Sequence, residues 1–314
     1  MGSDTTRRRP RALLLAGLCL CAAGTLAAQR SPFRSSVDVV ALTVTVTGAG
    51  GKHISGLSAE DFVVLEDGRP QAVSFFQREA SPLAVSLLID SSGSMQHELQ
   101  QAQQAASDFI TRLRTGDVAQ VVDFDRSIQV LQPFTDDREA LERAIYRMTA
   151  RGSTSMYNAV YVALRELGAL ASPPEGQVRR DVIVVLSDGE DTSSLVTFDH
   201  LLDAAKRSQT VIYAIGLGLG SGTTRRTAVP PQVALRTLAQ ESGGRVFLPR
   251  DGAALSEVYQ TIADELASQY VLGYTSNNTE RVGWRRVAVR VAKPGAQTRT
   301  RSGYYAGGRG VNAR

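Results

Sequence analysis

The residues of this chain best suited to chemistry lie in a short turn that follows an apolar segment. Asp90, Ser92 and Ser94 place three side-chain oxygens at alternate positions, and the residues between them are small. Carboxylate and hydroxyl oxygens are hard donors, which suit Mg²⁺ or Mn²⁺ better than Zn²⁺ or Cu²⁺. The turn is therefore a candidate site for a hard divalent cation.

Two further turns are rich in oxygen-bearing side chains. Residues 152–155 have the sequence Gly-Ser-Thr-Ser and come directly before a segment with helical character. Residues 187–191 have the sequence Ser-Asp-Gly-Glu-Asp and follow an apolar run. Both turns fall on predicted loops.

The elements that position these turns belong to an alternating pattern. Residues 83–89 form a nearly continuous apolar run, which is typical of a strand buried on both faces of a parallel sheet. Ligands of such sheets gather at the carboxyl ends of the strands, where the first turn lies. Further strands are predicted over residues 118–124, 128–131, 182–186, 210–216 and 245–248, and helices over residues 98–114, 138–148, 156–170, 198–207, 231–242 and 253–268. This order predicts the α/β class, with a doubly wound, mostly parallel, Rossmann-like sheet.

Short strands without intervening helices flank this region on both sides. They are predicted over residues 37–46, 61–65 and 71–76 before it, and over residues 270–274, 284–291 and 298–305 after it. A small antiparallel unit is marginally stable alone, so we expect the two ends to combine into one flanking antiparallel β unit. The predicted divisions are residues 35–80 for the N-terminal β unit, 81–269 for the α/β domain and 270–306 for the C-terminal β segment.

The first 28 residues differ from the rest of the chain. Four arginines, at positions 7, 8, 9 and 11, precede an apolar run over residues 12–28 that ends in small residues. This pattern is typical of a secretory signal peptide, so we expect a secreted or periplasmic protein, exported by the Sec route. An uncleaved membrane anchor is the alternative, because the run is marginal for a membrane span.

Removal of this leader changes the composition. Cys19 and Cys21 both lie within it, so the mature chain would have no disulfide and no thiolate metal site. The leader also contains four Arg and one Asp, so the 35 basic and 31 acidic residues of the chain become 31 and 30. This balance, without a basic stripe, argues against a nucleic-acid partner.

Taken together, the three turns resemble the metal-ion-dependent adhesion site of the von Willebrand factor type A domain. That site carries an Asp-x-Ser-x-Ser motif after the first strand, a Thr in a later Gly-Thr loop and an Asp after the fourth strand. Five residues match in order and approximate spacing: Asp90, Ser92, Ser94, Thr154 and Asp188. The likeness covers roughly residues 81–269, and it is specific because three separated pieces agree.

The resemblance implies that these five residues bind Mg²⁺ or Mn²⁺. The hydroxyls of Ser92, Ser94 and Thr154 would coordinate without neutralising the ion, while Asp90 and Asp188 would supply negative charge. In the resembling domains, an Asp or Glu of a protein partner fills the open coordination position. Residues 56–68, 269–275 and 300–306 also resemble the von Willebrand A-related proteins of acidobacteria, which supports the architecture more than an activity.

Other polar residues near the turns have plainer interpretations. Glu190 and Asp191 are expected to be solvated loop acids. Asp123 and Asp125 flank Phe124 at the end of a predicted strand on the same edge, and they are weaker candidates for a supporting role.

Catalysis is a weaker interpretation than binding, although Ser, His and Asp all occur. His97 lies one turn after the metal motif and could approach Ser94, but the chain has no Gly-x-Ser-x-Gly elbow. A phosphatase with an aspartate nucleophile would need a second Asp two residues after Asp90, where this chain has Ser92. We therefore expect no enzyme and no catalytic residue.

Two non-catalytic functions remain. The first is an exported adhesion or protein-binding module that acts through its metal and binds a partner carboxylate. The second is a structural or assembly scaffold of a cell-envelope complex, in which the metal site is incidental and the β unit makes the contacts. Contact with a membrane is expected only through an uncleaved leader. Metal dependence of partner binding separates the two functions.

Overall fold

The computed structural model describes residues 39–78, 81–173, 177–188, 191–219, 229–278 and 282–307. The predicted signal peptide, residues 1–28, lies outside these residues, and so does Glu190. Within the described ranges, no helix is both long and apolar enough to cross a membrane.

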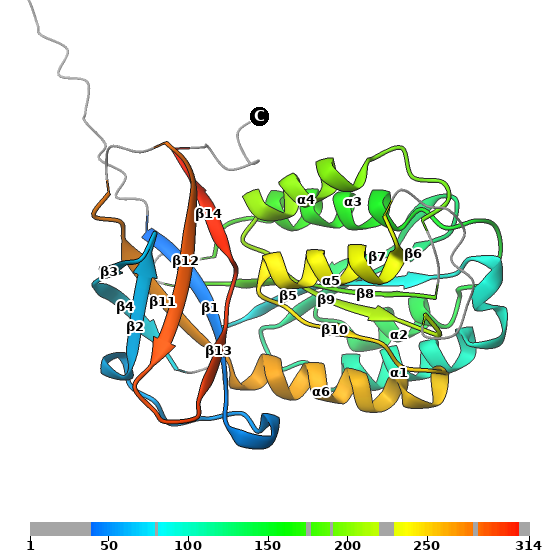
Figure 1. The fold of residues 1–314 in the computed structure, drawn as a ribbon. Coiled ribbons are helices and arrows are strands. Elements are labelled where there is room, and N and C mark those ends of the chain that lie inside the picture. Colours follow the sequence, from blue (N-terminus) through cyan, green and yellow to red (C-terminus); the bar gives the residue numbers. More distant parts are fainter. Residues whose placement is uncertain are drawn as a thin grey trace, which may run out of the picture. The chain divides into compact units, whose positions relative to one another are not determined.

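A six-stranded sheet forms the centre of the α/β domain (Figure 1). Its order is β10-β9-β8-β5-β6-β7, and only the β6–β7 pair is antiparallel. The strands are β5 (Leu83–Asp90), β6 (Val118–Phe124), β7 (Ile128–Thr135), β8 (Arg180–Ser187), β9 (Val211–Gly216) and β10 (Val246–Phe247). Every residue of β5 is buried, as its apolar run predicts for a central parallel strand.

Helices cover both faces of this sheet (Figure 1). The helices α1 (Leu99–Thr111), α2 (Arg138–Ile145) and α6 (Leu255–Ser268) pack on one face. The helices α3 (Met156–Ala169), α4 (Phe198–Arg207) and α5 (Pro231–Ser242) pack on the other. The predicted doubly wound α/β arrangement is therefore confirmed.

Strands from both ends of the chain form the flanking β unit. One four-stranded sheet has the order β13-β1-β11-β4, and the other has the order β14-β12-β2-β3. The strands are β1 (Val39–Thr47), β2 (Phe62–Glu66), β3 (Arg69–Gln71), β4 (Val73–Gln77), β11 (Tyr270–Thr275), β12 (Gly283–Val291), β13 (Gln297–Arg299) and β14 (Gly303–Ala306). Their inward residues share one apolar core, so the expected pairing of N-terminal and C-terminal segments is confirmed.

Two segments predicted as single strands are each divided between the two sheets. The predicted strand 71–76 ends as β3 at Gln71, which pairs with Val64 of β2, and resumes as β4 at Val73, which pairs with Tyr274 of β11. The predicted strand 298–305 is likewise split into β13 and β14. The prediction of two continuous strands is therefore wrong, because each segment passes from one sheet to the other at a corner of the β unit.

A buried polar network joins the last helix of the α/β domain to the β unit. Glu265 of α6 is 1% exposed and accepts hydrogen bonds from the hydroxyls of Thr45, at 3.2 Å, and Tyr213, at 2.5 Å. Arg299 of β13 forms an ion pair with the same carboxylate. The Gln269 amide donates to the hydroxyls of Thr45 and Tyr213 at 3.1 and 2.9 Å. We call these five residues the Glu265 network.

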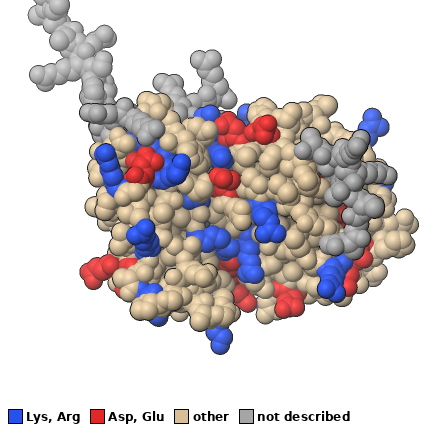
Figure 2. Space-filling model, in the orientation of Figure 1, with Lys and Arg blue, Asp and Glu red and all other residues tan. Residues whose placement is uncertain are grey.

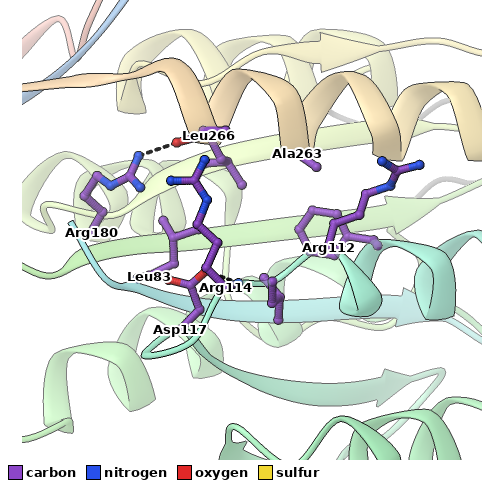
Figure 3. A pocket seen from close by; sticks show the side chains of 10 residues that line it. Leu83, Arg112, Arg114, Asp117, Arg180, Ala263 and Leu266 are labelled. Atoms are coloured by element: carbon purple, nitrogen blue, oxygen red, sulfur yellow. Dashed lines mark hydrogen bonds between the residues drawn. The ribbon is translucent and has the colours of Figure 1, made fainter. Parts of the chain in front are cut away.

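A cavity of about 30 Å³ lies between α1 and α6 (Figure 3). Arg180 at its edge donates to the Leu266 carbonyl at 2.7 Å, and Asp117 accepts a hydrogen bond from the Leu83 N–H at 2.8 Å. Leu83 and Arg180 are the first residues of β5 and β8. The cavity therefore lies at the amino ends of the strands, away from the predicted metal site.

Candidate metal site

The predicted metal residues lie where two neighbouring strands end. Strands β5 and β8 are parallel, and Ile89 is in register with Leu186. The chain therefore brings Asp90, the last residue of β5, and Asp188, the first residue after β8, to the same edge of the sheet. A short 3-10 helix, Gly93–His97, then turns the chain away from β5.

Hydrogen bonds fix both oxygens of Asp90. The Ser187 hydroxyl donates to Oδ2 at 2.6 Å, and the backbone N–H of Ser92 donates to Oδ1 at 2.8 Å. The side chain is fully buried. Asp90 is thus a carboxylate of defined orientation, with only neutral donors in these two bonds.

The remaining members of the first motif connect Asp90 to Asp188. The Ser92 and Ser94 hydroxyl oxygens are 3.0 Å apart, and the Ser94 hydroxyl donates to Asp188 Oδ1 at 2.9 Å. The structure therefore brings four of the five predicted ligands together by direct contacts.

Thr154 is brought to the same edge by its backbone neighbours. The Gly93 N–H donates to the Gly152 carbonyl at 3.0 Å, and the Arg151 N–H donates to the Ser91 carbonyl at 2.7 Å. The Thr154 side chain is 5% exposed. Among the hydrogen bonds of the described residues, none joins its hydroxyl to the other four side chains.

The electrostatic environment of the two carboxylates is unfavourable for their charged forms. Burial raises the pKa of Asp90 to about 6, although hydrogen bonds from Ser187 and Ser92 oppose this effect, and the charge of Asp188 raises the pKa further. Burial also raises the pKa of Asp188, the Ser94 hydroxyl opposes this, and the charge of Glu98 adds to it. Both shifts indicate carboxylates that lack compensating positive charge.

The donor set fits a hard divalent cation. Neither Asp90 nor Asp188 forms an ion pair within the described ranges. No group of three or more His, Cys, Asp or Glu in these ranges could hold a metal, so an ion at this edge would depend on hydroxyl oxygens as well. Two carboxylates with adjacent hydroxyls form an all-oxygen set suited to Mg²⁺ or Mn²⁺.

One neighbouring acid has a different role from the expected one. Asp191 is not a solvated loop acid, because its carboxylate accepts hydrogen bonds from the Tyr157 N–H at 2.7 Å and the Ser194 N–H at 3.0 Å. It ties the loop after β8 to the start of α3.

Asp125 supports the Thr154 loop through its backbone. Its carbonyl accepts a hydrogen bond from the Ser155 N–H at 2.8 Å. Burial raises the pKa of its carboxyl group, but hydrogen bonds from Ser127 and Arg151 outweigh burial and lower it. Burial raises the pKa of the neighbouring Asp123.

Ser187 and Glu98 contribute to the site, although the sequence patterns assigned them no role. Ser187 stands in the oxygen-rich turn 187–191, and its hydroxyl holds Asp90. Glu98 affects the pKa of Asp188, and its carboxylate accepts a hydrogen bond from the Gly252 N–H at 2.9 Å. The position of Ser187 directly before Asp188 was a usable signal, whereas the Glu98 contact spans 154 residues of sequence.

Comparison with known families identifies a match in the centre of the chain. A family model described as von Willebrand factor type A domain matches residues 85–190. The structure is similar to that of a von Willebrand factor type A protein from Catenulispora acidiphila, with a TM-score of 0.51 and 17% sequence identity, over 76% of this chain and 71% of that chain.

Two curated relatives carry the same descriptive name. A UPF0353 protein of Mycolicibacterium paratuberculosis is 28% identical over 230 residues, which cover 66% of this chain and 67% of the relative. A UPF0353 protein of Nocardia farcinica is 26% identical over 218 residues, which cover 61% of this chain and 64% of the relative. The matched segments span about two thirds of the length of these relatives.

Proposed function

Because the chain carries a von Willebrand factor type A domain, we propose that it is an exported, metal-dependent protein-binding or adhesion module. Such domains are commonly interaction modules. The proposed ligands of Mg²⁺ or Mn²⁺ are Asp90, Ser92, Ser94, Thr154 and Asp188. The proposed partner is a protein that presents an Asp or Glu side chain.

The observation that carries this proposal is a pair of neighbouring carboxylates, the buried Asp90 and the half-buried Asp188, neither of which forms an ion pair within the described residues. Asp90 is held from two sides by Ser187 and Ser92, and Ser94 orients Asp188, so the chain itself pre-positions the donors. A bound divalent cation would supply the missing positive charge and an electrophilic position for an incoming carboxylate. No proton transfer or bond cleavage is needed, and His97 is an exposed residue. We therefore propose a binding function without catalysis.

The charge distribution supports a protein partner, and the predicted leader supports export. On the face shown in Figure 2, basic and acidic side chains are interspersed, which favours a protein partner over nucleic acid. Secretion or a periplasmic location is proposed from the predicted signal peptide of residues 1–28.

Calorimetric titration of the mature protein, stripped with a chelator, tests the metal site. We expect saturable one-to-one binding of Mg²⁺ and of Mn²⁺, which Asp188→Ala abolishes because one of only two charged ligands is lost. Glu139→Ala is the matched control, since Glu139 lies on α2 with an 88% exposed side chain. Equal binding by the wild type and Asp188→Ala would contradict the proposed ligand set.

A scaffold function within a cell-envelope complex is the second candidate. The Glu265 network favours it, because buried polar contacts tie the α/β domain to the β unit, as a rigid assembly component requires. Partners captured from envelope extract decide between the two functions. Partners lost on chelation and in Asp90→Ala support the metal-dependent module, and partners retained in both conditions support the scaffold.

A further inference from the structure

The loop after the metal site carries the most exposed large apolar side chain of the described residues. Leu195 is 94% exposed and lies in the Asp191 loop, which we define as residues 191–197. Single apolar residues are common on protein surfaces, so this exposure alone does not indicate a function. The hydrogen bonds that hold the loop are the reason to assign one.

Two side chains anchor the first half of the Asp191 loop. The Asp191 carboxylate accepts hydrogen bonds from the Tyr157 N–H at 2.7 Å, the Ser194 N–H at 3.0 Å and the Ser194 hydroxyl at 2.6 Å. The Ser194 hydroxyl also accepts a hydrogen bond from the Asn158 N–H at 3.0 Å. The loop is thus fastened to the first turn of α3.

A third side chain fixes the backbone at Leu195 itself. Asn158 Oδ1 accepts hydrogen bonds from the Leu195 N–H at 3.1 Å and the Val196 N–H at 3.0 Å. Val196 packs against the core beneath α3 and α4, whereas Leu195 stays in solvent. With both N–H groups held, the Leu195 side chain is presented outward by a defined backbone.

The same loop is bonded directly to a proposed metal ligand. The N–H groups of Thr192 and Ser193 donate to the Thr154 carbonyl at 2.9 and 3.0 Å. Leu195 follows Thr192 by three residues, a span of roughly 10 Å even in a fully extended chain. A protein segment bound at the proposed metal site would therefore lie close enough to contact Leu195.

From these contacts we infer that Leu195 is a second, apolar contact of the binding face. The partner is then a protein segment in which a large apolar side chain lies close to the acidic residue that meets the metal. This inference rests on the proposed function, because it assigns the partner chemistry of the same site. Preorganisation of the loop means that little conformational freedom is lost on contact. Burial of a leucine side chain strengthens association roughly tenfold or more.

Synthetic glycine–serine peptides on an array test the inference. Each peptide carries one Glu, with or without one Phe at stepped separations from it, and binding is measured in Mg²⁺ and in chelator. The variant is Leu195→Asn, and the matched control is Val233→Asn, an exposed apolar residue on α5. A further variant, Asn158→Ala, frees the loop while keeping the leucine.

We expect Mg²⁺-dependent binding of the Glu peptides that becomes roughly tenfold tighter or more when Phe stands at one preferred separation. Leu195→Asn should abolish this Phe preference, Asn158→Ala should weaken it, and Val233→Asn should leave it unchanged. Binding of Glu-only peptides should be equal in the wild type, Leu195→Asn and Val233→Asn. A Phe preference that is absent in the wild type or survives Leu195→Asn overturns the inference but leaves the proposed function intact. Absence of any Mg²⁺-dependent Glu binding contradicts the proposed function itself, and the inference with it.

Discussion

At the residue scale, Asp90 determines how the site responds to protons and metal. A buried carboxylate without a cationic partner is costly to ionise, and the donors around Asp90 are neutral groups that only partly offset this cost. Its folded pKa of about 6 lies above the ordinary value of 3.8. The folded state without metal therefore binds a proton more tightly than the unfolded state does.

Metal-free protein should consequently lose stability as the pH rises through about 6, the folded pKa of Asp90. We expect Asp90→Asn to be more stable than the wild type at pH 7 in chelator, by up to roughly 3 kcal/mol, because the amide keeps the shape without the charge. Urea unfolding of both proteins in chelator, from below the ordinary pKa of 3.8 up to pH 7, measures the difference in their free energies of unfolding.

The advantage of Asp90→Asn should shrink as the pH falls below the folded pKa and reverse in saturating Mg²⁺, which stabilises only the wild type. An advantage that does not change with pH would show that ionisation of Asp90 is not the cause.

Some of these residue-scale features follow from sequence and others do not. Strand periodicity predicts that Asp90 and Asp188 share one edge, because both follow apolar runs of parallel strands. The roles of Ser187 and Asp191 depend on side-chain contacts that periodicity does not encode. Asp191 accepts a hydrogen bond from Tyr157, 34 positions earlier in the chain. Neither partner of such a bond is distinctive in sequence.

At the element scale, one glycine, Gly243, allows the end of α5 to approach the β unit closely. Gly243 ends α5 in a left-handed conformation, with φ of 86°. A Cβ atom there would lie 2.5 Å from the Arg301 backbone nitrogen, which belongs to the segment between β13 and β14. Only glycine fits both the backbone angle and this contact.

Gly243→Ala should therefore destabilise the protein by more than backbone strain alone. Gly68→Ala is the matched control, because Gly68 has φ of 81° and open space around its Cα. We expect the loss of unfolding free energy for Gly243→Ala to exceed that for Gly68→Ala by about 1–3 kcal/mol, the usual cost of overpacking. Equal losses in denaturant unfolding would mean that the Arg301 segment moves aside freely.

The elements and the central sheet could largely be predicted from sequence, whereas the division of the flanking strands between two sheets could not. Helix α4 and strand β6 have the predicted limits, because apolar periodicity and end signals agree there. The error at residues 71–76 arose because the apolar residues that follow Gln71 indicate a strand without indicating which sheet it joins. The first half, β3, pairs with the nearby strand β2, whereas β4 pairs with β11, about 200 residues away in sequence.

At the scale of the whole molecule, the Glu265 network links the two parts of the described chain. Its carboxylate lies on the last helix of the α/β domain, and its partners lie on β1, β9 and β13. Removal of one member of a buried charged network leaves the remaining buried groups without a partner. It therefore lowers the free energy of unfolding by more than the loss of one exposed contact does. The two parts should therefore unfold together.

Glu265→Ala should lower the unfolding free energy by on the order of 3 kcal/mol, because Arg299 and two hydroxyls lose their shared acceptor. Glu257→Ala on the same helix is the control, since Glu257 is exposed and its loss should cost no more than about 0.5 kcal/mol. Calorimetry of the wild type should give a single transition. Two separate transitions, with only one shifted by Glu265→Ala, would contradict a shared folding unit.

The most direct test of the central claim is a crystal structure of the mature protein grown with Mn²⁺, with anomalous differences recorded for the metal. We predict a single strong anomalous peak enclosed by oxygens of Asp90, Ser92, Ser94, Thr154 and Asp188, and its absence in crystals of Asp188→Ala. A peak bound by other residues, or none at this edge of the sheet in crystals saturated with Mn²⁺, would contradict the claim.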